Sequence, residues 1–358
     1  MDTKKIIQRN KFWAGILLAQ IILFYAISKS DFLIKLHQIF FETQMEFHQY
    51  IFSWIPFSFG DIFYLFLGGY LVYIIQLSFR KTKIAIRKAL VLLNIFYFVY
   101  QLFWGLLYFQ PPIIRNLEKT NPTIEELKQL TTQFVNRCNQ DRTQVKDDRN
   151  GNFTIENIEK IKTELVNSSK VPYFQNLKKS KAISIKKSLF SDAMDYTGIL
   201  GYYNPFTAEA QYNKNIPAIG LPFTLAHENA HQKGIAREEE ASFFAYLEGK
   251  NAKNINLKYS TDYFALKSLM IYLSNKDSLF VKQIFADFSA GLKKDFLAEK
   301  EFYEKHNGIG NTILSTTNDW FLKSNQQDGE VNYSYFTVLL IRHEIKELRF
   351  TTQFQKHK

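Results

Sequence analysis

Three long apolar runs in the first third of the chain most strongly limit how it can fold. Residues 12–28, 62–79 and 89–109 contain no charged residue. Each run approaches the ~20 residues that a helix needs to cross ~30 Å of hydrocarbon. The first run is long and bulky and others follow it, which favours an uncleaved anchor over a signal peptide. The sequence therefore predicts a membrane domain over residues 1–111 with three transmembrane helices.

Basic residues beside these runs predict the orientation of the chain. The N-terminal MDTKKIIQRNK and the loop RKTKIAIRK at 80–88 are both rich in Lys and Arg. Such segments stay on the cytoplasmic side, so three spans place everything after Phe109 outside the cytoplasm. We therefore expect a multi-pass protein of the bacterial inner (cytoplasmic) membrane, with the lipid bilayer as a partner. The outer loop 30–61 has apolar residues near helical spacing and is expected to lie on the membrane, to cover the downstream domain, or simply to connect the spans.

The net charge of +11 does not indicate a nucleic-acid partner. Residues 1–111 hold 11 basic against 5 acidic side chains, so about half the excess lies beside the apolar runs. The rest of the chain holds 34 basic against 29 acidic side chains, which is an ordinary mixed surface. The single cysteine, Cys138, allows neither an internal disulfide nor a CxxC metal motif.

Residues 112–358 have the composition of a soluble domain that is mainly helical. Helical patterns cover 123–139, 154–169, 257–275 and 277–306, and a threonine opens each of the first two. Weaker strand patterns cover 183–190 and 198–212. The predicted fold class is mainly α, with three N-terminal transmembrane helices followed by an α-rich (α+β) domain outside the cytoplasm.

The stretch LPFTLAHENAHQKGIAREEEASFFAYL, residues 221–247, has the pattern of a zinc site. His227 and His231 are four residues apart, so a helix presents both imidazoles on one face. Glu228 lies about 100° further around the helix, where it can take a proton from water and give it to a leaving amine. Leu221, Phe223, Leu225 and Ala226 precede the histidines, which indicates a helix that enters from the core, and Gly234 can end it in a left-handed conformation.

A third zinc ligand is expected among three consecutive acids, Glu238, Glu239 and Glu240. The three acids also suit the first turn of a new helix, where negative charge is favourable. Helical spacing puts Ala241 and Ala245 on the face of Glu238, and these small residues permit close packing. Glu238 is therefore favoured, while Glu240 and Glu239 remain alternatives.

The two motifs together resemble those of glutamate-zincin metallopeptidases. H-E-x-x-H followed by E-x-x-A-[DNS]-x-F-A is similar to the membrane-bound CAAX-prenyl/heat-shock protease group and to the phage-repressor-cleaving group. This resemblance implies a zincin-like domain and a Zn²⁺ cofactor, with Glu238 as a ligand. Ser242 stands where those families usually have an Asp or Asn that orients a zinc-binding histidine.

A second resemblance covers nearly the whole chain. The protein is similar to an uncharacterised bacterial membrane family, a domain of unknown function whose members have three N-terminal spans and a zincin-like C-terminal domain. The matching pieces are PFSFGD (56–61), WGLLYFQPP (104–112), GYYNPFTAEAQYN (201–213), residues 221–247, LKYS (257–260) and LKSNQQDGEVNYSY (322–335). This family implies an architecture and a metal site but no substrate.

Substrate contacts are expected from the segment before the predicted zinc helix. Zincins place a strand here that pairs with the substrate backbone, so Glu209 is predicted to bind a substrate amine or a second cation. The alternative is that Glu209 is simply an exposed acid on a turn and an edge strand. Four side chains are candidates to stabilise the oxyanion formed during peptide hydrolysis, and the sequence selects none of them: Tyr202, Tyr203, Tyr259 and His306.

The sequence as a whole predicts a membrane-anchored zinc metallopeptidase that acts on a peptide or protein outside the cytoplasm, with Glu228 as general base. The alternative is a non-catalytic membrane sensor or scaffold with a structural zinc. A structural site would be closed by a fourth protein ligand, and no obvious one lies near the motif.

Overall fold

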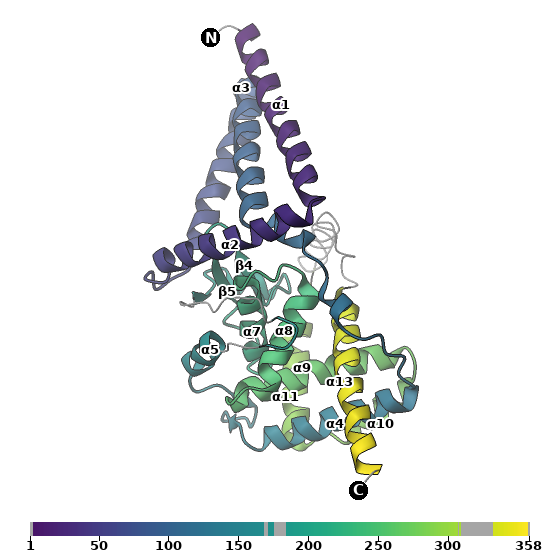
Figure 1. Cartoon of the computed structure of the whole chain (residues 1–358). Coiled ribbons are helices and arrows are strands. Elements are labelled where there is room, and N and C mark those ends of the chain that lie inside the picture. The colour runs from purple at the N-terminus through teal and green to yellow at the C-terminus, as the bar shows by residue number, and fades with distance from the viewer. Residues whose placement is uncertain (1–2, 168–170, 175–183, 307, 309–331, 357–358) are drawn as a thin grey trace.

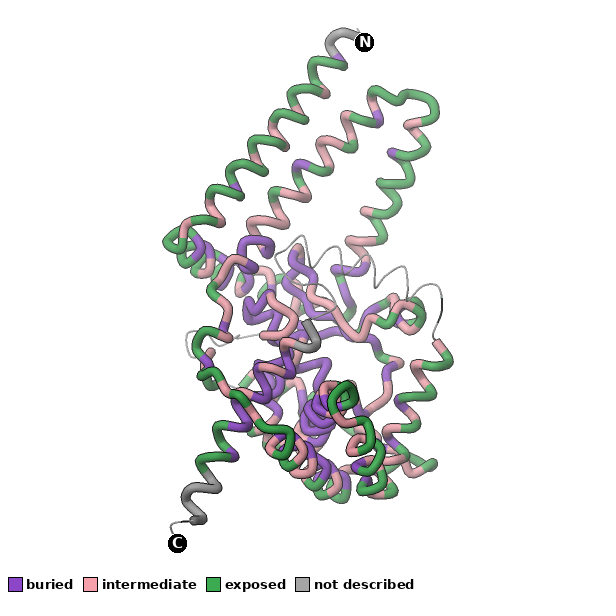
Figure 2. The backbone as a smooth tube through the Cα atoms, turned by 90° about the vertical axis from the view of Figure 1, so that its right-hand side faces the viewer, coloured by how far each residue is buried: buried purple, intermediate pink, exposed green. Residues whose placement is uncertain are grey.

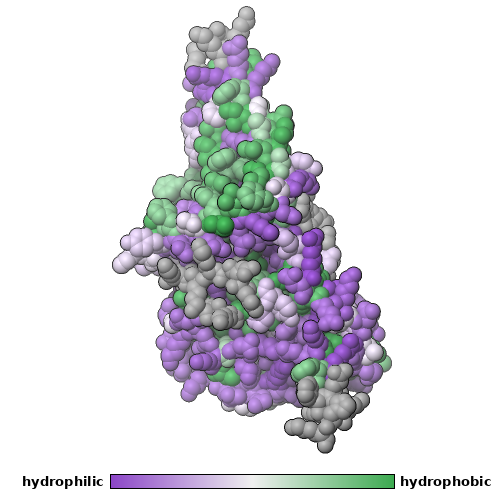
Figure 3. Space-filling view, in the orientation of Figure 1, coloured by the Kyte–Doolittle hydropathy of each residue, from purple (hydrophilic) through white to green (hydrophobic). Residues whose placement is uncertain are grey.

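The apolar runs form helices that stand clear of the rest of the protein (Figure 1). The computed structural model describes residues 3–167, 171–174, 184–306, 308 and 332–356. Within them, two helices are long and apolar enough to cross a membrane, α1 (Thr3–Ser28) and α3 (Phe59–Phe103). Only 6% of the most apolar window of each helix is buried, so neither is a core helix (Figures 2 and 3).

Helix α3 folds back on itself at Lys81, whose φ of −140° and ψ of 59° are not helical. The Phe63 and Phe96 rings stack at 5.9 Å, and Lys88 Nζ lies over the rings of Tyr70 and Tyr73. These contacts join the two limbs of an antiparallel hairpin, and Figure 2 shows the exposed turn between them. The sequence predicted a loop over residues 80–88, and this loop is too long. The chain reverses at the single residue Lys81, and residues 82–88 are helical.

The helix formed by the third apolar run ends earlier than the predicted residue 109. Helix α3 ends at Phe103, and the short 3-10 helix η1 (Gly105–Phe109) follows it. Trp104, with φ of −149°, breaks the α-helix, and its side chain is buried together with Tyr108. These aromatic rings pack inside the protein.

Helix α2 (Asp31–Phe52) lies crosswise between the standing helices and the domain beneath them (Figure 1). Ser30 caps its first turn by accepting a hydrogen bond from Leu33 N. Phe41 and Met45, on its inner face, are buried against the domain. The segment 30–61 thus contains a helix that covers the domain, which was one of its expected arrangements.

The described residues of the remaining chain form a helical domain with two small sheets. Its helices are η2 (Ile113–Asn116), α4 (Ile124–Arg142), α5 (Ile158–Asn167), α6 (Ser191–Asp195), α7 (Leu221–Gln232), α8 (Glu238–Lys250), α9 (Ile255–Ser274), α10 (Ser278–Ala286), α11 (Ala290–His306) and α13 (Asn332–Lys356). Strands β1 (Lys146–Asp147) and β2 (Phe153–Thr154) form a hairpin. The other sheet has the order β3-β5-β4, with β3 (Ile185–Lys187) parallel and β4 (Gly201–Asn204) antiparallel to β5 (Glu209–Tyr212).

Most predicted elements of this domain are present, with two changes. Helix α4 has the expected Thr123 cap, and Glu126 completes a capping box with it. Thr154 does not open the next helix, because it pairs with Lys146 in the β1-β2 hairpin and Asn157 caps the first turn instead. The pattern 277–306 forms two helices, α10 and α11. Much of the piece 322–335 lies outside the described residues.

Helices α7 and α8 pack closely at the centre of the core, covered by α9, α4 and α13. Four alanines on the α7 and α8 surfaces, Ala226, Ala230, Ala241 and Ala245, have no exposed area. Small side chains let two helix backbones approach, which agrees with the expectation for Ala241 and Ala245. The stacked rings of Phe223 and Phe264, 3.8 Å apart, join α7 to α9.

A buried carboxylate joins the three-stranded sheet to the start of α3. Glu209 on β5 is fully buried and accepts hydrogen bonds from Phe59 N at 3.2 Å and Gly60 N at 2.6 Å. Lys186 Nζ on β3 donates to the same carboxylate. Asp61 strengthens this junction by accepting from Leu189 N at 2.6 Å. Negative charge at a helix N-terminus is favourable, so the sheet holds the base of the hairpin.

We expect Glu209→Gln to lower the thermal unfolding midpoint of the detergent-solubilised protein. The amide can still accept hydrogen bonds but leaves buried Lys186 without a counter-charge, at a cost of about 3 kcal/mol. Circular dichroism melting is the measurement. Glu304→Gln is the matched control, because its partner Lys300 is 3.6 Å away and both side chains are exposed. Equal midpoints for the two variants would contradict the proposed junction.

Candidate metal centre

Helices α7 and α8 bring two imidazoles and one carboxylate together. His227 Nε2 lies 3.1 Å from His231 Nε2 and 3.1 Å from Glu238 Oε2. The distance from His231 Nε2 to Glu238 Oε1 is 3.6 Å. One ligand atom from each residue therefore lies within 4.8 Å of the others. The predicted residues converge on one point, as a metal ion requires.

The opposite ring nitrogens have partners that fix both imidazoles. His227 Nδ1 lies 3.1 Å from Ser242 Oγ on α8, so the serine occupies the orienting position that the resemblance implied. His231 Nδ1 donates to the carbonyl oxygen of Ile235 at 2.7 Å. Each ring thus keeps Nε2 directed at the shared point, which is how proteins orient histidine ligands.

The turn between α7 and α8 depends on a glycine. Gly234 has φ of +89°, a left-handed conformation that ends α7 as the sequence predicted. A Cβ at this position would also lie 2.7 Å from the Phe41 ring of α2. Glycine therefore permits both the reversal that brings Glu238 to the histidines and the close approach of α2.

Of the three consecutive acids, Glu238 is the one that lies with the imidazoles. Its side chain is 38% exposed, so the centre is open on this side. Glu240 instead accepts a hydrogen bond from Ile113 N at 2.7 Å, which attaches the end of the WGLLYFQPP segment to α8. The helical register of α8 therefore turns Glu238 toward the imidazoles as a candidate ligand and gives Glu240 a structural contact instead.

Glu228 is buried beside the cluster but outside it. Gly201 on β4 lies so close that a Cβ there would be 2.7 Å from Glu228 Oε1. Glu228 Oε2 is buried and has no hydrogen-bond partner among the described residues. A buried carboxylate oxygen normally has a partner, so this atom is suited to a water molecule or a substrate group.

The ionisable groups of the cluster shift one another's pKa values. Burial lowers the pKa of His231, but the carboxylates of Glu238 and Glu228 outweigh burial and raise it to about 9. Burial raises the pKa of Glu238, yet the two imidazoles hold it well below its usual range. Burial, opposed by His231 and reinforced by Glu238, raises the pKa of Glu228 to about 8. The cluster thus holds a proton that a metal ion would displace on binding.

Aromatic side chains from the membrane-proximal segments close one side of the centre. The Trp104 ring meets the His231 ring edge-on at 5.7 Å, and Tyr203 on β4 packs on Trp104 at 4.5 Å. Arg237 donates to the Tyr108 carbonyl oxygen at 2.7 Å, which holds η1 against the start of α8. The sequence motif WGLLYFQPP is therefore part of the wall of the centre.

The predicted substrate-binding acid, Glu209, is not exposed to a substrate. Its carboxylate is already occupied by the N-terminus of α3 and by Lys186. A substrate amine could reach it only by breaking these contacts, and we leave Glu209 out of the site on this ground.

The four candidates for oxyanion stabilisation lie in different places. The Tyr202 hydroxyl donates to Asp61, and the Tyr259 hydroxyl donates to Asp295 at 2.7 Å in the core. The His306 ring, at the end of α11, meets the Tyr196 ring edge-on. Tyr203 is the candidate beside the centre, and its buried hydroxyl has no partner among the described residues.

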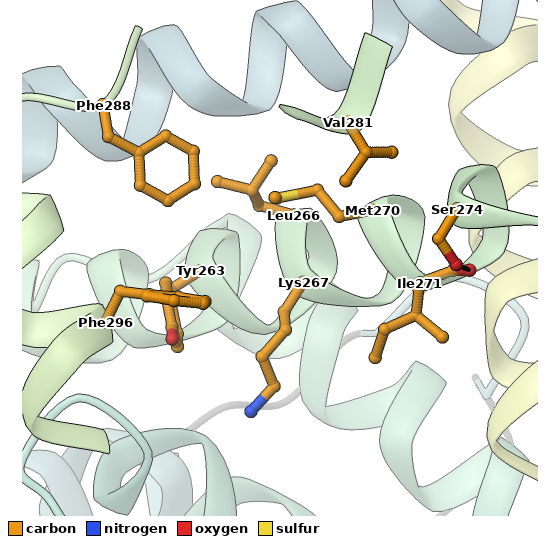
Figure 4. A pocket seen from close by; sticks show the side chains of 9 residues that line it. All are labelled: Tyr263, Leu266, Lys267, Met270, Ile271, Ser274, Val281, Phe288 and Phe296. Atoms are coloured by element: carbon orange, nitrogen blue, oxygen red, sulfur yellow. Dashed lines mark hydrogen bonds between the residues drawn. The ribbon is translucent and has the colours of Figure 1, made fainter. Parts of the chain in front are cut away.

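Two other features of the described chain lie away from this centre. Helix α13 carries His343, Glu344 and Glu347 close together, but Lys250 on α8 binds both carboxylates at 2.6 Å. A cavity of about 210 Å³ lies among α9, α10 and α11 (Figure 4). Its lining is mostly apolar, and its one cationic side chain, Lys267, is paired with Glu299 at 2.8 Å.

Several residues that build the centre were not identified from the sequence. Ser260, within the LKYS piece, accepts from Phe223 N at 3.1 Å and so satisfies a free N–H at the start of α7. Trp104 and Gly201 also belong to pieces that resembled the family. Membership in those pieces was the only sequence feature that pointed to these residues. Their contacts join segments far apart in the chain, so local patterns do not reveal them.

The residues present fit a zinc ion. Two Nε2 atoms and a carboxylate oxygen form the ligand set of many catalytic zinc sites, and both imidazoles have outer partners. Among the described residues, this group contains no fourth His, Cys, Asp or Glu. A zinc ion held by these three residues would keep a further coordination position for water or substrate.

The fold and site describe a mainly helical protein with two helices long and apolar enough to cross a membrane and with a candidate metal centre. The chain belongs to the family described as "Protein of unknown function (DUF3810)", which matches residues 37–341. The comparison with curated proteins found no match. The comparison with solved structures likewise found none. The resemblance to glutamate zincins therefore remains a prediction.

We expect His227→Ala and His231→Ala each to remove most of the zinc bound by the purified protein, since a single ligand and its geometry are lost. Glu238→Ala should lower zinc occupancy more than Glu240→Ala, because only Glu238 lies with the imidazoles. Plasma mass spectrometry measures the metal, and circular dichroism confirms that each variant is folded. Full zinc retention in both histidine variants would refute the centre.

Proposed function

We propose that this protein is a membrane-anchored zinc metallopeptidase. The observation that carries the proposal is the convergence of His227, His231 and Glu238 beside a buried carboxylate, Glu228, that has an unpartnered oxygen. A purely structural zinc site has no use for that carboxylate. An ion with three protein ligands also keeps the open position that catalysis needs.

A zinc ion at these ligands would supply a Lewis acid that polarises a peptide carbonyl and lowers the pKa of water. Glu228 takes a proton from the attacking water as the new C–O bond forms. It then gives this proton to the amide nitrogen, so the C–N bond breaks and the amine leaves. Water is consumed, and one carboxylic acid and one amine are produced. Ser242 and the Ile235 carbonyl hold the imidazoles in place during these steps.

The edge of the sheet supports an extended peptide as substrate. Among the described strands β4 is an edge strand, and its Gly201 lies directly against Glu228. A peptide that adds to such an edge forms main-chain hydrogen bonds and lies along it. Tyr203, on the same strand, has a free hydroxyl that suits it to stabilise the oxyanion.

The proposal includes three membrane crossings. A straight 45-residue helix would measure ~68 Å, about twice the ~30 Å hydrocarbon thickness. The reversal at Lys81 divides α3 into two limbs of suitable length, and α1 supplies the third crossing. Basic residues near the turn and at the N-terminus support a cytoplasmic location for that end. The domain after Phe109 then lies outside the cytoplasm of a bacterial inner membrane.

We expect Glu228→Gln to retain zinc and fold but to lose peptidase activity. Glutamine keeps the size of the side chain but cannot accept the proton, which costs at least ~10²-fold in rate. The assay compares cellular phenotype and peptide hydrolysis for wild type, Glu228→Gln and His227→Ala. If Glu228→Gln supports the wild-type phenotype and His227→Ala does not, the protein needs its metal but no hydrolysis. The alternative sensor or scaffold function would then replace the peptidase.

We expect reporter proteins fused after Lys358 to lie outside the cytoplasm. Alkaline phosphatase, which needs an oxidising compartment, should be active in this fusion. Green fluorescent protein, which does not become fluorescent when it is exported unfolded, should be dark. Fusions at Lys81 should give the opposite result, since that turn is assigned to the cytoplasm. A fluorescent fusion after Lys358 would reverse the assigned orientation.

A further inference from the structure

Both ends of α2 are fixed to the base of the standing helices. Lys29 and Ser30 alone separate the end of α1 from the start of α2, and residues 53–58 connect α2 to α3. Helix α2 is ~33 Å long at 1.5 Å per residue. If α1 and α3 cross a bilayer, a helix tied so closely to both must lie along its surface.

Helix α2 has two apolar faces on opposite sides. The inner face, with Phe41 and Met45, is buried on the domain. The outer face carries a stripe of large apolar side chains, all at least 52% exposed: Phe32, Leu36, Ile39, Phe47 and Tyr50, with Trp54 just beyond the end of the helix. Successive members are three or four residues apart, except that Thr43 occupies the position between Ile39 and Phe47. Thr43 is the only polar residue in the register of this stripe. Figure 3 shows hydrophobic surface continuing from the standing helices down to the level of α2.

We propose that the outer face of α2 lies in the headgroup layer of the membrane, and that the metal centre beneath it cleaves peptide bonds close to the membrane surface. The occupant of the outer face is lipid, because the stripe continues the apolar surface of α1 and α3 and carries no charge. An uncharged stripe of this length in water would be an aggregation site. The choice of substrate rests on the metallopeptidase function proposed above.

The distance from the membrane surface to the metal centre limits how far from a membrane span a substrate can be cut. The Phe41 ring on α2 lies 6.1 Å from the Trp104 ring, which lies 5.7 Å from the His231 ring. With the ~10 Å diameter of the helix, the centre lies within roughly 22 Å of the outer face. An extended chain covers this distance in about seven residues. The substrates are therefore membrane proteins or anchored peptides, cut in the segment that follows a span.

The placement of α2 is tested by labelling the whole protein in nanodiscs of phosphatidylethanolamine and phosphatidylglycerol. The single native cysteine, Cys138, has no exposed area, so an introduced cysteine takes the fluorophore alone. A label at Tyr50→Cys should be quenched by lipid-attached nitroxide and protected from aqueous iodide. The control label at Lys282→Cys, on exposed α10, should behave in the opposite way.

Two results would overturn this placement. Quenching of the Tyr50→Cys label by iodide, as at Lys282→Cys, would place the outer face in water. Protection from both quenchers would show that protein covers the face, as in an interface with a second copy of this chain.

The substrate class is tested by mapping new protein N-termini in cells that carry the wild-type chain or Glu228→Gln. Wild-type-dependent cleavage sites should cluster within about ten residues of a span, on the outer side of the membrane. Cleavage mainly in soluble exported proteins would overturn the substrate class and leave the peptidase intact. The absence of any wild-type-dependent site would refute the peptidase itself, while the labelling result would still decide the position of α2.

Discussion

The buried contact between Glu209 and the first turn of α3 joins the apolar hairpin to the domain. One carboxylate accepts the N–H groups of Phe59 and Gly60 and also binds Lys186. Its strand, β5, lies between β3 and β4, and β4 rests against Glu228. The position of the hairpin and the position of the proposed general base therefore depend on the same three-stranded sheet. The Glu209 carboxylate can move little in this position, because a buried charge that loses its partners destabilises the folded protein.

The candidate metal centre combines residues from the segments next to the apolar helices and from the domain core. Helices α7 and α8 supply the three candidate ligands, and the alanines between these helices let His227 and Glu238 come close together. Trp104 and Phe41 come from the segments nearest the apolar helices and pack against His231 and Gly234. The centre is thus built at the boundary between the two parts. This location connects the proposed chemistry with the proposed membrane surface, since one layer of side chains separates α2 from His231.

The predictions that depended on local periodicity agree best with the structure. The HENAH segment forms a helix, Gly234 ends it, and the histidines share a face, because these properties follow from 3.6 residues per turn and from glycine's conformational freedom. The preference for Glu238 followed from the alanines on its face. The predicted helix start at Thr154 and the end of the third run at 109 were wrong. Thr154 pairs with Lys146, eight residues earlier, in a hairpin, and Trp104 packs against rings from distant segments, Phe41 and Tyr203. Neither contact is visible in helical periodicity.

The sequence by itself determined the apolar helices, the basic turn between two of them and the pair of imidazoles on one helical face. Each is a property of neighbours along the chain and needs no other segment. Only the tertiary structure decided that Glu209 is a structural anchor, that Glu228 meets Gly201, and that Trp104 covers His231. The reason is physical: a carboxylate has the same chemistry at a helix N-terminus and in a substrate cleft. Which role it takes depends on the groups that folding brings within hydrogen-bond distance.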